Sequence, residues 1–214
     1  MCGKYGGPAD QEVFAGYFDV PPPFRAEAGE DLMKPYKDVL VYVKNRQGQI
    51  IEKTMRWGFI PSSWKAGVAD WTFSTTHARL ESVADANKCF SRAWHLGRRA
   101  IFPVGVVFER GWAISRVDGQ PMGVAGVYDH AHTLDGDVLS VAMLTREPGP
   151  KMREIHDREA VILDVASAAR WLDGANDIDL AQPLPDDVFL VMPESEWKRQ
   201  AKKAEVRQVD ALPL

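Results

Sequence analysis

Residues 39–49, from which the fold class follows most readily, are Val39-Leu40-Val41-Tyr42-Val43-Lys44-Asn45-Arg46-Gln47-Gly48-Gln49. Residues 39–43 are apolar, β-branched or aromatic and predict a strand. Asn45 to Gly48 supplies the polar residues and the glycine of a turn, and residues 49–57 predict the partner strand that returns beside the first. The chain therefore contains a β-hairpin, whose two strands run antiparallel.

Predicted strands outnumber predicted helices in the rest of the chain, and they follow one another as hairpins rather than as βαβ units. This order is typical of an α+β fold with mainly antiparallel β-sheets and a few flanking helices. The remaining strands are expected at residues 71–76, 100–108, 122–128, 138–145 and 159–163, the helices at residues 9–18, 81–96 and 166–172, and a loop at residues 58–67.

The chain is expected to form a single domain over residues 1–180, followed by a C-terminal extension at residues 181–214. A hydrophobic content of 45% is enough for a real core in a chain of 214 residues. The Pro- and Asp-rich start of the extension indicates extended structure, and its Lys- and Glu-rich end is expected to fray.

Composition predicts a cytoplasmic protein away from membranes. No stretch approaches the roughly 18 apolar residues of a membrane-spanning helix, and the N-terminus lacks a secretory pattern. Two cysteines, Cys2 and Cys89, do not make a disulfide framework, which fits a reducing compartment. We interpret His130-Ala131-His132, beside the turn-like Asp135-Gly136-Asp137, as a surface loop, and expect neither a metal ion nor a cofactor.

The second residue offers unusual chemistry. If Met1 is removed, which a small second residue such as Cys2 usually permits, the mature chain begins with a cysteine that carries an α-amine and a thiol on adjacent carbons. An aldehyde condenses with the amine to an imine, and the thiol then closes onto the same carbon as a five-membered thiazolidine. The second step is intramolecular and gains a large effective molarity. On this residue alone, an accident of the chain start explains Cys2 equally well.

Two further stretches contain residues suited to proton transfer. Glu109 follows a very apolar strand, where a partly desolvated carboxylate suits acid–base work; the alternative is an exposed glutamate paired with Arg110. His156 lies in Ile155-His156-Asp157-Arg158, where a carboxylate can orient an imidazole. The alternative there is a histidine at a helix end beside an Asp–Arg ion pair.

Charge alone does not favour a nucleic-acid partner, because the formal net charge is −4. Cations nevertheless gather around tryptophans, at Arg56-Trp57, at Trp64-Lys65 and between Arg92 and Arg99. Aromatic and cationic side chains together suit base stacking with phosphate contacts. Buried tryptophans flanked by solvated arginines are the alternative.

In their order and spacing, these stretches resemble the SRAP family (SOS-response-associated peptidase, also called abasic-site processing proteins) over residues 1–175. The matching segments are Met1-Cys2-Gly3-Lys4, Arg56-Trp57-Gly58-Phe59-Ile60-Pro61, His77-Ala78-Arg79-Leu80-Glu81-Ser82, Phe90-Ser91-Arg92-Ala93-Trp94, Arg99 to Arg110, Ala125-Gly126-Val127-Tyr128-Asp129 and Ile155 to Leu163.

The resemblance implies a barrel-like SRAP fold and capture of abasic sites in single-stranded DNA as a thiazolidine. It makes Cys2 the nucleophile, Glu109 the catalytic glutamate, which also removes residues preceding the cysteine, and His156 the residue that assists sugar ring opening and crosslink reversal. The DNA-contacting residues would be Lys4, Arg56, Trp57, Trp64, Arg79 and Arg158, with His77, Arg79 and Arg158 also supporting the active site.

The resemblance also implies the partners: single-stranded DNA with abasic sites, and single-strand/double-strand junctions, at which the loop of Trp64 would wedge against bases. The protein is expected to be a monomer that associates with the nucleoid when on DNA.

The chain departs from the family pattern at the support residue, because His77 stands where the family has asparagine. An imidazole is bulkier than an amide and lacks its paired donor and acceptor. Lys4 replaces an arginine and loses the bidentate fork. Two alternatives therefore stay open: a non-catalytic module that binds single-stranded DNA, and a thiol-dependent peptidase.

Overall fold

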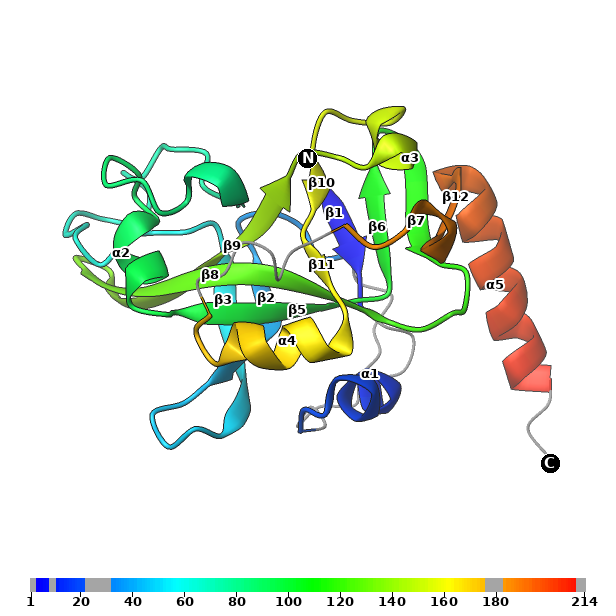
Figure 1. Ribbon diagram of the computed structural model, residues 1–214, viewed down its shortest axis with the longest axis horizontal. Helices are drawn as coiled ribbons and strands as arrows, with labels where there is room; N and C mark the ends of the chain where they lie inside the picture. Colours follow the sequence, from blue (N-terminus) through cyan, green and yellow to red (C-terminus); the bar gives the residue numbers. More distant parts are fainter. Residues whose placement is uncertain (1–2, 8–10, 22–31, 176–182, 211–214) are drawn as a thin grey trace.

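Five strands pair side by side into a closed β-barrel at the centre of the molecule, in the order β9, β3, β2, β5, β8 and back to β9 (Figure 1). The computed structural model describes residues 3–7, 11–21, 32–175 and 183–210. Four of the barrel pairings are antiparallel and the β3–β9 pairing is parallel, which confirms the mainly antiparallel α+β fold. The barrel strands are β2 (Asp38–Lys44), β3 (Ile50–Trp57), β5 (Arg99–Val104), β8 (Met122–Thr133) and β9 (Gly136–Arg146).

A second, four-stranded antiparallel sheet lies beside the barrel. Its order is β1 (Lys4–Gly6), β6 (Val106–Glu109), β7 (Trp112–Arg116) and β12 (Phe189–Pro193). The apolar stretch expected as one strand over residues 100–108 is divided between the two sheets. Gly105 separates β5 from β6, and its N–H donates to the carbonyl of Gly6 at 2.9 Å. The chain thus passes directly from β5 of the barrel into β6 of the small sheet, and β6 ends at Glu109.

Three short strands extend the barrel sheet where β8 and β9 separate. Strand β4 (His77–Arg79) runs parallel to β9 on one side, and β10 (Glu159–Ala160) pairs with the end of β9 at Thr145 and Arg146. Strand β11 (Ile162–Leu163) pairs with β8. The segments that carry His77 and His156 are therefore both attached to the same end of β9.

The helices lie around the two sheets (Figure 1). The helix predicted at residues 166–172 is confirmed as α4, and the one predicted at residues 9–18 is confirmed as α1 from Gln11 onward, residues 9 and 10 lying outside the described part of the chain. Asp164 caps α4 by accepting from the Ser167 N–H at 2.7 Å. The described helices are α1 (Gln11–Phe18), α2 (Ser91–His95), α3 (Pro150–Arg153), α4 (Val165–Leu172) and α5 (Glu194–Asp210), with 3-10 turns η1 (Leu80–Ser82) and η3 (Asp186–Val188).

Some local expectations are wrong. Residues 81–96 form two short helical pieces, η1 and α2, rather than one helix. The strand expected at residues 71–76 lies at His77–Arg79 instead, because β9 offers its free edge there. Residues 130 and 132 belong to β8 and not to a surface loop.

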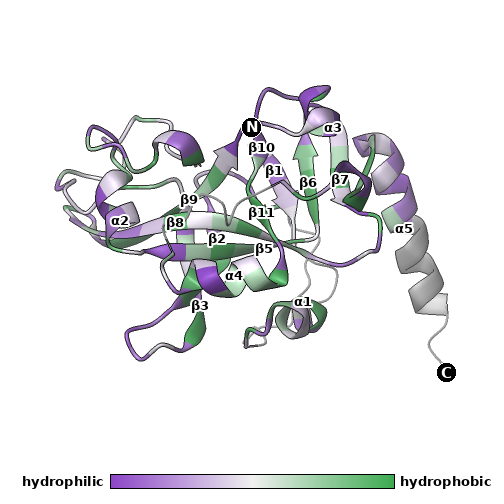
Figure 2. Cartoon of the chain, viewed as in Figure 1, coloured by the Kyte–Doolittle hydropathy of each residue, from purple (hydrophilic) through white to green (hydrophobic). Residues whose placement is uncertain are grey.

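The C-terminal segment is extended in β12, as expected for its start, but its Lys- and Glu-rich end is helical over Glu194–Asp210 rather than frayed. Strand β12 pairs with β7 over five residues, from Phe189↔Arg116 to Pro193↔Trp112, and α5 follows it. Trp197 of α5 packs its ring edge-to-face on Phe108 at a centroid distance of 5.1 Å. The first turns of α5 are otherwise largely hydrophilic (Figure 2). Trp197 thus attaches an otherwise largely polar helix to β6 through an apolar contact.

Trp57 lies at the centre of the core between the two sheets. Its side chain has no exposed surface, its ring packs against Tyr5 and Phe102, and its indole N–H donates to the carbonyl of Thr76 at 2.9 Å. No helix among the described residues is long and apolar enough to cross a membrane.

Replacing Trp57 with alanine is expected to lower the free energy of unfolding by about 3–5 kcal/mol, because it removes a large buried ring and leaves a cavity. The milder Trp57→Phe keeps an aromatic ring and loses the hydrogen bond, at a cost of about 1–3 kcal/mol. Urea unfolding followed by far-ultraviolet circular dichroism measures both. Equal losses in the two variants would contradict this account of the core.

Candidate active site

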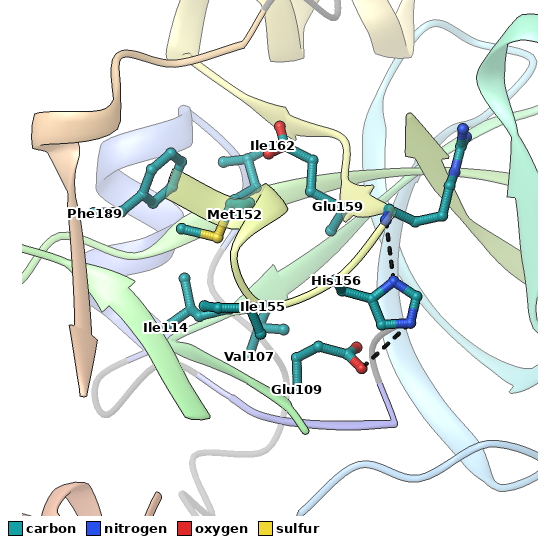
Figure 3. Close-up of a pocket in the computed structure, with 11 residues that line it drawn as sticks. Val107, Glu109, Ile114, Met152, Ile155, His156, Glu159, Ile162 and Phe189 are labelled. Atoms are coloured by element: carbon teal, nitrogen blue, oxygen red, sulfur yellow. Dashed lines mark hydrogen bonds and ion pairs between the residues drawn. The ribbon is translucent and has the colours of Figure 1, made fainter. Parts of the chain in front are cut away.

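Glu109 and His156 face each other where the small sheet meets the barrel sheet (Figure 3). Glu109 Oε1 lies 3.8 Å from His156 Nε2, and the two side chains are only 11% and 13% exposed. Glu109 is the last residue of β6, which ends there because Arg110 and Gly111 form a two-residue turn with φ of 47° and 84°. The structure thus brings together the two acid–base residues that the sequence analysis singled out.

Backbone contacts fix the orientation of the His156 ring. The His156 N–H donates to the carbonyl of Met152 at 2.9 Å, which extends the turn of α3, and the Arg158 N–H donates to Nδ1 at 3.0 Å. Asp157 Oδ1 lies 2.5 Å from the same nitrogen, on a side chain that is 82% exposed. In the neutral ring Nδ1 accepts from the Arg158 amide, so Nε2 carries the proton and directs it toward Glu109. In the charged ring Nδ1 would donate to Asp157.

Burial lowers the pKa of His156 below its ordinary value of 6.5. We therefore expect a titration of the histidine ring signals by nuclear magnetic resonance to show His156 neutral at pH 7, with its midpoint below 6.5; His156→Gln assigns the signal. Because the unfolded chain binds this proton at the higher pH, the stability linked to His156 is complete above about pH 6.5 and is lost as the pH falls through the folded pKa. A midpoint above 6.5 would contradict the burial argument.

A largely apolar pocket adjoins the Glu109–His156 pair (Figure 3). Besides Glu109 and His156 it includes the polar residues Arg158 and Glu159. The apolar wall limits water beside the pair and strengthens electrostatic interactions there. Its apolar lining consists of Val107, Ile114, Met152, Ile155, Ala160, Ile162 and Phe189.

Arg158 holds the His156 segment against β4 and β9. Its two Nη atoms donate to both carboxylate oxygens of Glu81 at 2.6 and 2.8 Å, and Nη2 also donates to the carbonyl of Thr145 at 2.9 Å. The Arg158 side chain is only 9% exposed. These contacts order the segment that carries His156, and the expected contact of Arg158 with DNA phosphate stays a prediction. Arg79, at the end of β4, is exposed.

His77 begins β4, and its ring packs edge-to-face on Trp57 at a centroid distance of 5.7 Å. Its Nδ1 lies 3.0 Å from the hydroxyl of Thr76. The backbone of β4 is held in register by β9, with His77 opposite Met143. The imidazole that replaces the family's asparagine is therefore partly supported by the core rather than projecting freely into solvent.

Cys2 lies outside the described residues. The strand that follows it begins at Lys4, which pairs with Phe108, the neighbour of Glu109. Lys4 Nζ forms an ion pair with Glu194 Oε1 of α5 at 2.7 Å and lies over the Phe108 ring at 5.4 Å. The ion pair joins β1 to α5 and compensates part of the Lys4 charge, and the expected contact of Lys4 with DNA stays a prediction.

Three residues in or just before the loop of residues 58–67 were expected to contact DNA, and they differ in solvent exposure. Trp57 is buried and offers no surface to DNA, which corrects its expected contact role. Arg56 is partly exposed; it donates to the carbonyl of Tyr36 at 2.8 Å and lies over the Tyr36 ring. Trp64 is also partly exposed, and its indole N–H donates to the carbonyl of Gly67 at 3.0 Å.

The sequence analysis missed two aromatic residues beside Trp64. Trp71 packs on Trp64 at a ring distance of 5.1 Å and on Phe73 at 4.8 Å, and Phe73 is 61% exposed. The loop is attached to β8 through the buried side chain of Asp129, which accepts a hydrogen bond from the Ser62 N–H at 2.8 Å. The spacing of aromatic residues at 64, 71 and 73 was a usable signal, but residues 71–76 were interpreted as a strand.

The fold and this site define the family of the protein. The chain belongs to the SRAP (SOS response associated peptidase) family, whose sequence profile matches residues 1–205. That match includes β12 and the start of α5.

Relatives of known name are abasic site processing proteins. YobE of Bacillus subtilis is 28% identical over 207 residues, which cover 86% of this chain and 88% of YobE. YMR114C of Saccharomyces cerevisiae is 29% identical over 130 residues, which cover 56% of this chain and 34% of the yeast protein.

Solved structures share the fold. A protein from Bordetella bronchiseptica aligns with a TM-score of 0.79 at 25% identity, covering 90% of this chain and 99% of that protein. A protein from Bacteroides thetaiotaomicron aligns with a TM-score of 0.75 at 16% identity, covering 90% of this chain and 91% of the other.

Proposed function

We propose that this protein processes abasic sites in DNA by capturing them, in single-stranded DNA, as a thiazolidine on Cys2 after Met1 is removed. The observation that carries the proposal is the Glu109–His156 pair, with 3.8 Å between Oε1 and Nε2, beside the start of β1. Consecutive Cα atoms are about 3.8 Å apart, so the Cα of Cys2 is at most about 8 Å from that of Lys4, whose strand partner Phe108 directly precedes Glu109. The names of the relatives YobE and YMR114C support the substrate.

The reaction begins with the closed sugar of the abasic site, which must open to its aldehyde. Glu109 accepts the proton of the C1′ hydroxyl while the Nε2–H of His156 gives its proton to the ring oxygen, and the C1′–ring oxygen bond breaks. The proton then returns from Glu109 to Nε2 across the gap between them. Neutral His156 suits this donor role, and the lowered pKa keeps it neutral at pH 7.

The aldehyde carbon then forms two bonds to Cys2, one to its nitrogen and one to its sulfur. The α-amine adds to the aldehyde carbon, and one of its protons passes to the aldehyde oxygen. Glu109 then takes the second proton from the nitrogen and delivers it to the resulting hydroxyl, which leaves as water. The thiol adds to the imine carbon, and its proton goes to the imine nitrogen through Glu109. The sum is one aldehyde and one cysteine joined with the loss of one water.

The surface proposed to hold the DNA consists of partly or fully exposed aromatic and cationic groups. Trp64, Trp71 and Phe73 provide faces on which bases stack, and Arg79 and Arg56 provide charge for phosphates. Lys4 and Arg158, each already paired with a carboxylate, take part by positioning the site.

The experiment incubates the mature protein with single-stranded DNA carrying one abasic site, and with the same strand lacking it, and separates the products on a denaturing gel. We expect a shifted band with the abasic strand only. Salt-sensitive binding of both strands without a shifted band would identify a DNA-binding module instead. Cleavage of an unrelated peptide that requires Cys2 would support the peptidase alternative.

A further inference from the structure

Two histidines and an aspartate gather on one face of the β8–β9 hairpin. His130 and His132 are two residues apart in β8, so their side chains share a face of the strand. Asp137 of β9 is the direct cross-strand partner of His132. The two histidines were expected in a loop without a metal ion, and the strand geometry is what brings them together with the aspartate.

The potential ligand atoms of the three residues are close enough for one ion. His132 Nδ1 lies 2.5 Å from Asp137 Oδ1, and His130 Nε2 lies 3.4 Å from Asp137 Oδ2. Each residue offers one ligand atom within 4.8 Å of the others. Ligands at about 2.0–2.2 Å from a tetrahedral ion lie roughly 3.4 Å from one another. Small rotations of these exposed side chains therefore reach a coordinating geometry.

The hairpin does not need these three residues for its own stability. Strands β8 and β9 already pair over eight positions, from Gly126↔Met143 to Thr133↔Gly136. Ion pairs on the surface contribute little to stability, and the side chains of His132 and Asp137 are each 66% exposed. A structural role alone therefore does not account for two imidazoles directed at one carboxylate.

We propose that His130, His132 and Asp137 bind a divalent transition-metal ion such as Zn²⁺, Ni²⁺ or Cu²⁺. Imidazole ligands favour these ions, whereas Mg²⁺ and Ca²⁺ favour sites made of oxygen atoms alone. Three protein ligands leave at least one coordination position open to water or to another anionic oxygen. The cluster lies near the start of β9, whereas β10 pairs with the other end of that strand. At about 3.3 Å per residue, the two ends of β9 are roughly 30 Å apart. The ion therefore has no part in the proposed chemistry at Glu109 and His156.

Isothermal titration of chelator-treated protein with ZnCl₂ tests the proposal. We expect one ion per chain, with affinity lowered on the order of tenfold or more in His132→Ala and in Asp137→Asn. His95→Ala removes another exposed histidine, near the end of α2, and serves as the matched control with unchanged affinity. Circular dichroism verifies that each variant is folded. Absence of binding at millimolar Zn²⁺, or binding unchanged in both ligand variants, would overturn the proposal.

A second measurement locates the ion, because Cys2 and His156 are other groups that bind transition metals. Paramagnetic Ni²⁺ broadens the amide signals nearest to it. We expect broadening first at residues 130–139, and broadening confined to residues 107–110 and 154–158 would contradict the assignment. This test is independent of DNA, so its result leaves the proposed capture of abasic sites untouched.

Discussion

Replacing Cys2 with alanine is expected to abolish the covalent adduct with abasic single-stranded DNA. The variant loses the thiol that closes the thiazolidine and retains the α-amine, so it forms at most an imine, which water hydrolyses. Denaturing gels after incubation with the abasic strand measure the loss. Non-covalent binding to the unmodified strand should persist, because the cationic and aromatic groups that would hold DNA are unchanged.

Two matched variants separate the requirements of this reaction. Cys89→Ala removes the other cysteine, whose pKa burial raises to about 11, and should leave adduct formation unchanged. Insertion of a glycine that remains before Cys2 keeps the thiol but removes the cysteine α-amine, and should abolish the adduct. An adduct of undiminished yield in Cys2→Ala would contradict the proposed nucleophile.

Glu109→Gln is expected to slow adduct formation by about 10²–10⁴-fold, the usual contribution of a positioned general acid–base group. Glutamine keeps the shape of the side chain, but it neither accepts the C1′ hydroxyl proton nor protonates the departing hydroxyl. Single-turnover kinetics on denaturing gels measure the rate. The Glu109 side chain is only 11% exposed, so circular dichroism must accompany the assay to establish that the variant is folded.

Glu147→Gln is the matched control for that experiment, because it makes the same change at an exposed glutamate just beyond β9. Its rate should equal that of the unaltered protein. A Glu109→Gln variant that reacts at the same rate as this control would show that the proton transfers do not pass through Glu109.

Local patterns predicted the parts of the fold that depend on neighbouring residues. The hairpin of residues 39–57 has apolar strands around a polar turn, and the helix of residues 166–172 follows a capping aspartate; both are present in the structure. The sequence did not reveal β4, because its pairing depends on the free edge of β9, which is distant in the chain. Likewise, β12 is a strand because β7 offers it an edge.

The candidate site was predicted mainly through the resemblance to the SRAP family. Glu109 and His156 were each singled out with an ordinary structural alternative, and their approach to 3.8 Å required the fold. Burial also decided between alternatives that the sequence left open: Trp57 is a core residue, whereas Trp64 is partly exposed. The ion pairs of Lys4 with Glu194 and of Arg158 with Glu81 join residues far apart in the chain, and no local pattern indicates them.

Intact-mass spectrometry follows both the removal of Met1 and the capture of the abasic site by Cys2. The protein is produced without a tag and weighed before and after incubation with single-stranded DNA carrying one abasic site. We expect a mass lower by one methionine before the reaction, and then a gain equal to the mass of the DNA less one water. Loss of the methionine without any gain in mass after incubation would contradict capture of the abasic site by Cys2.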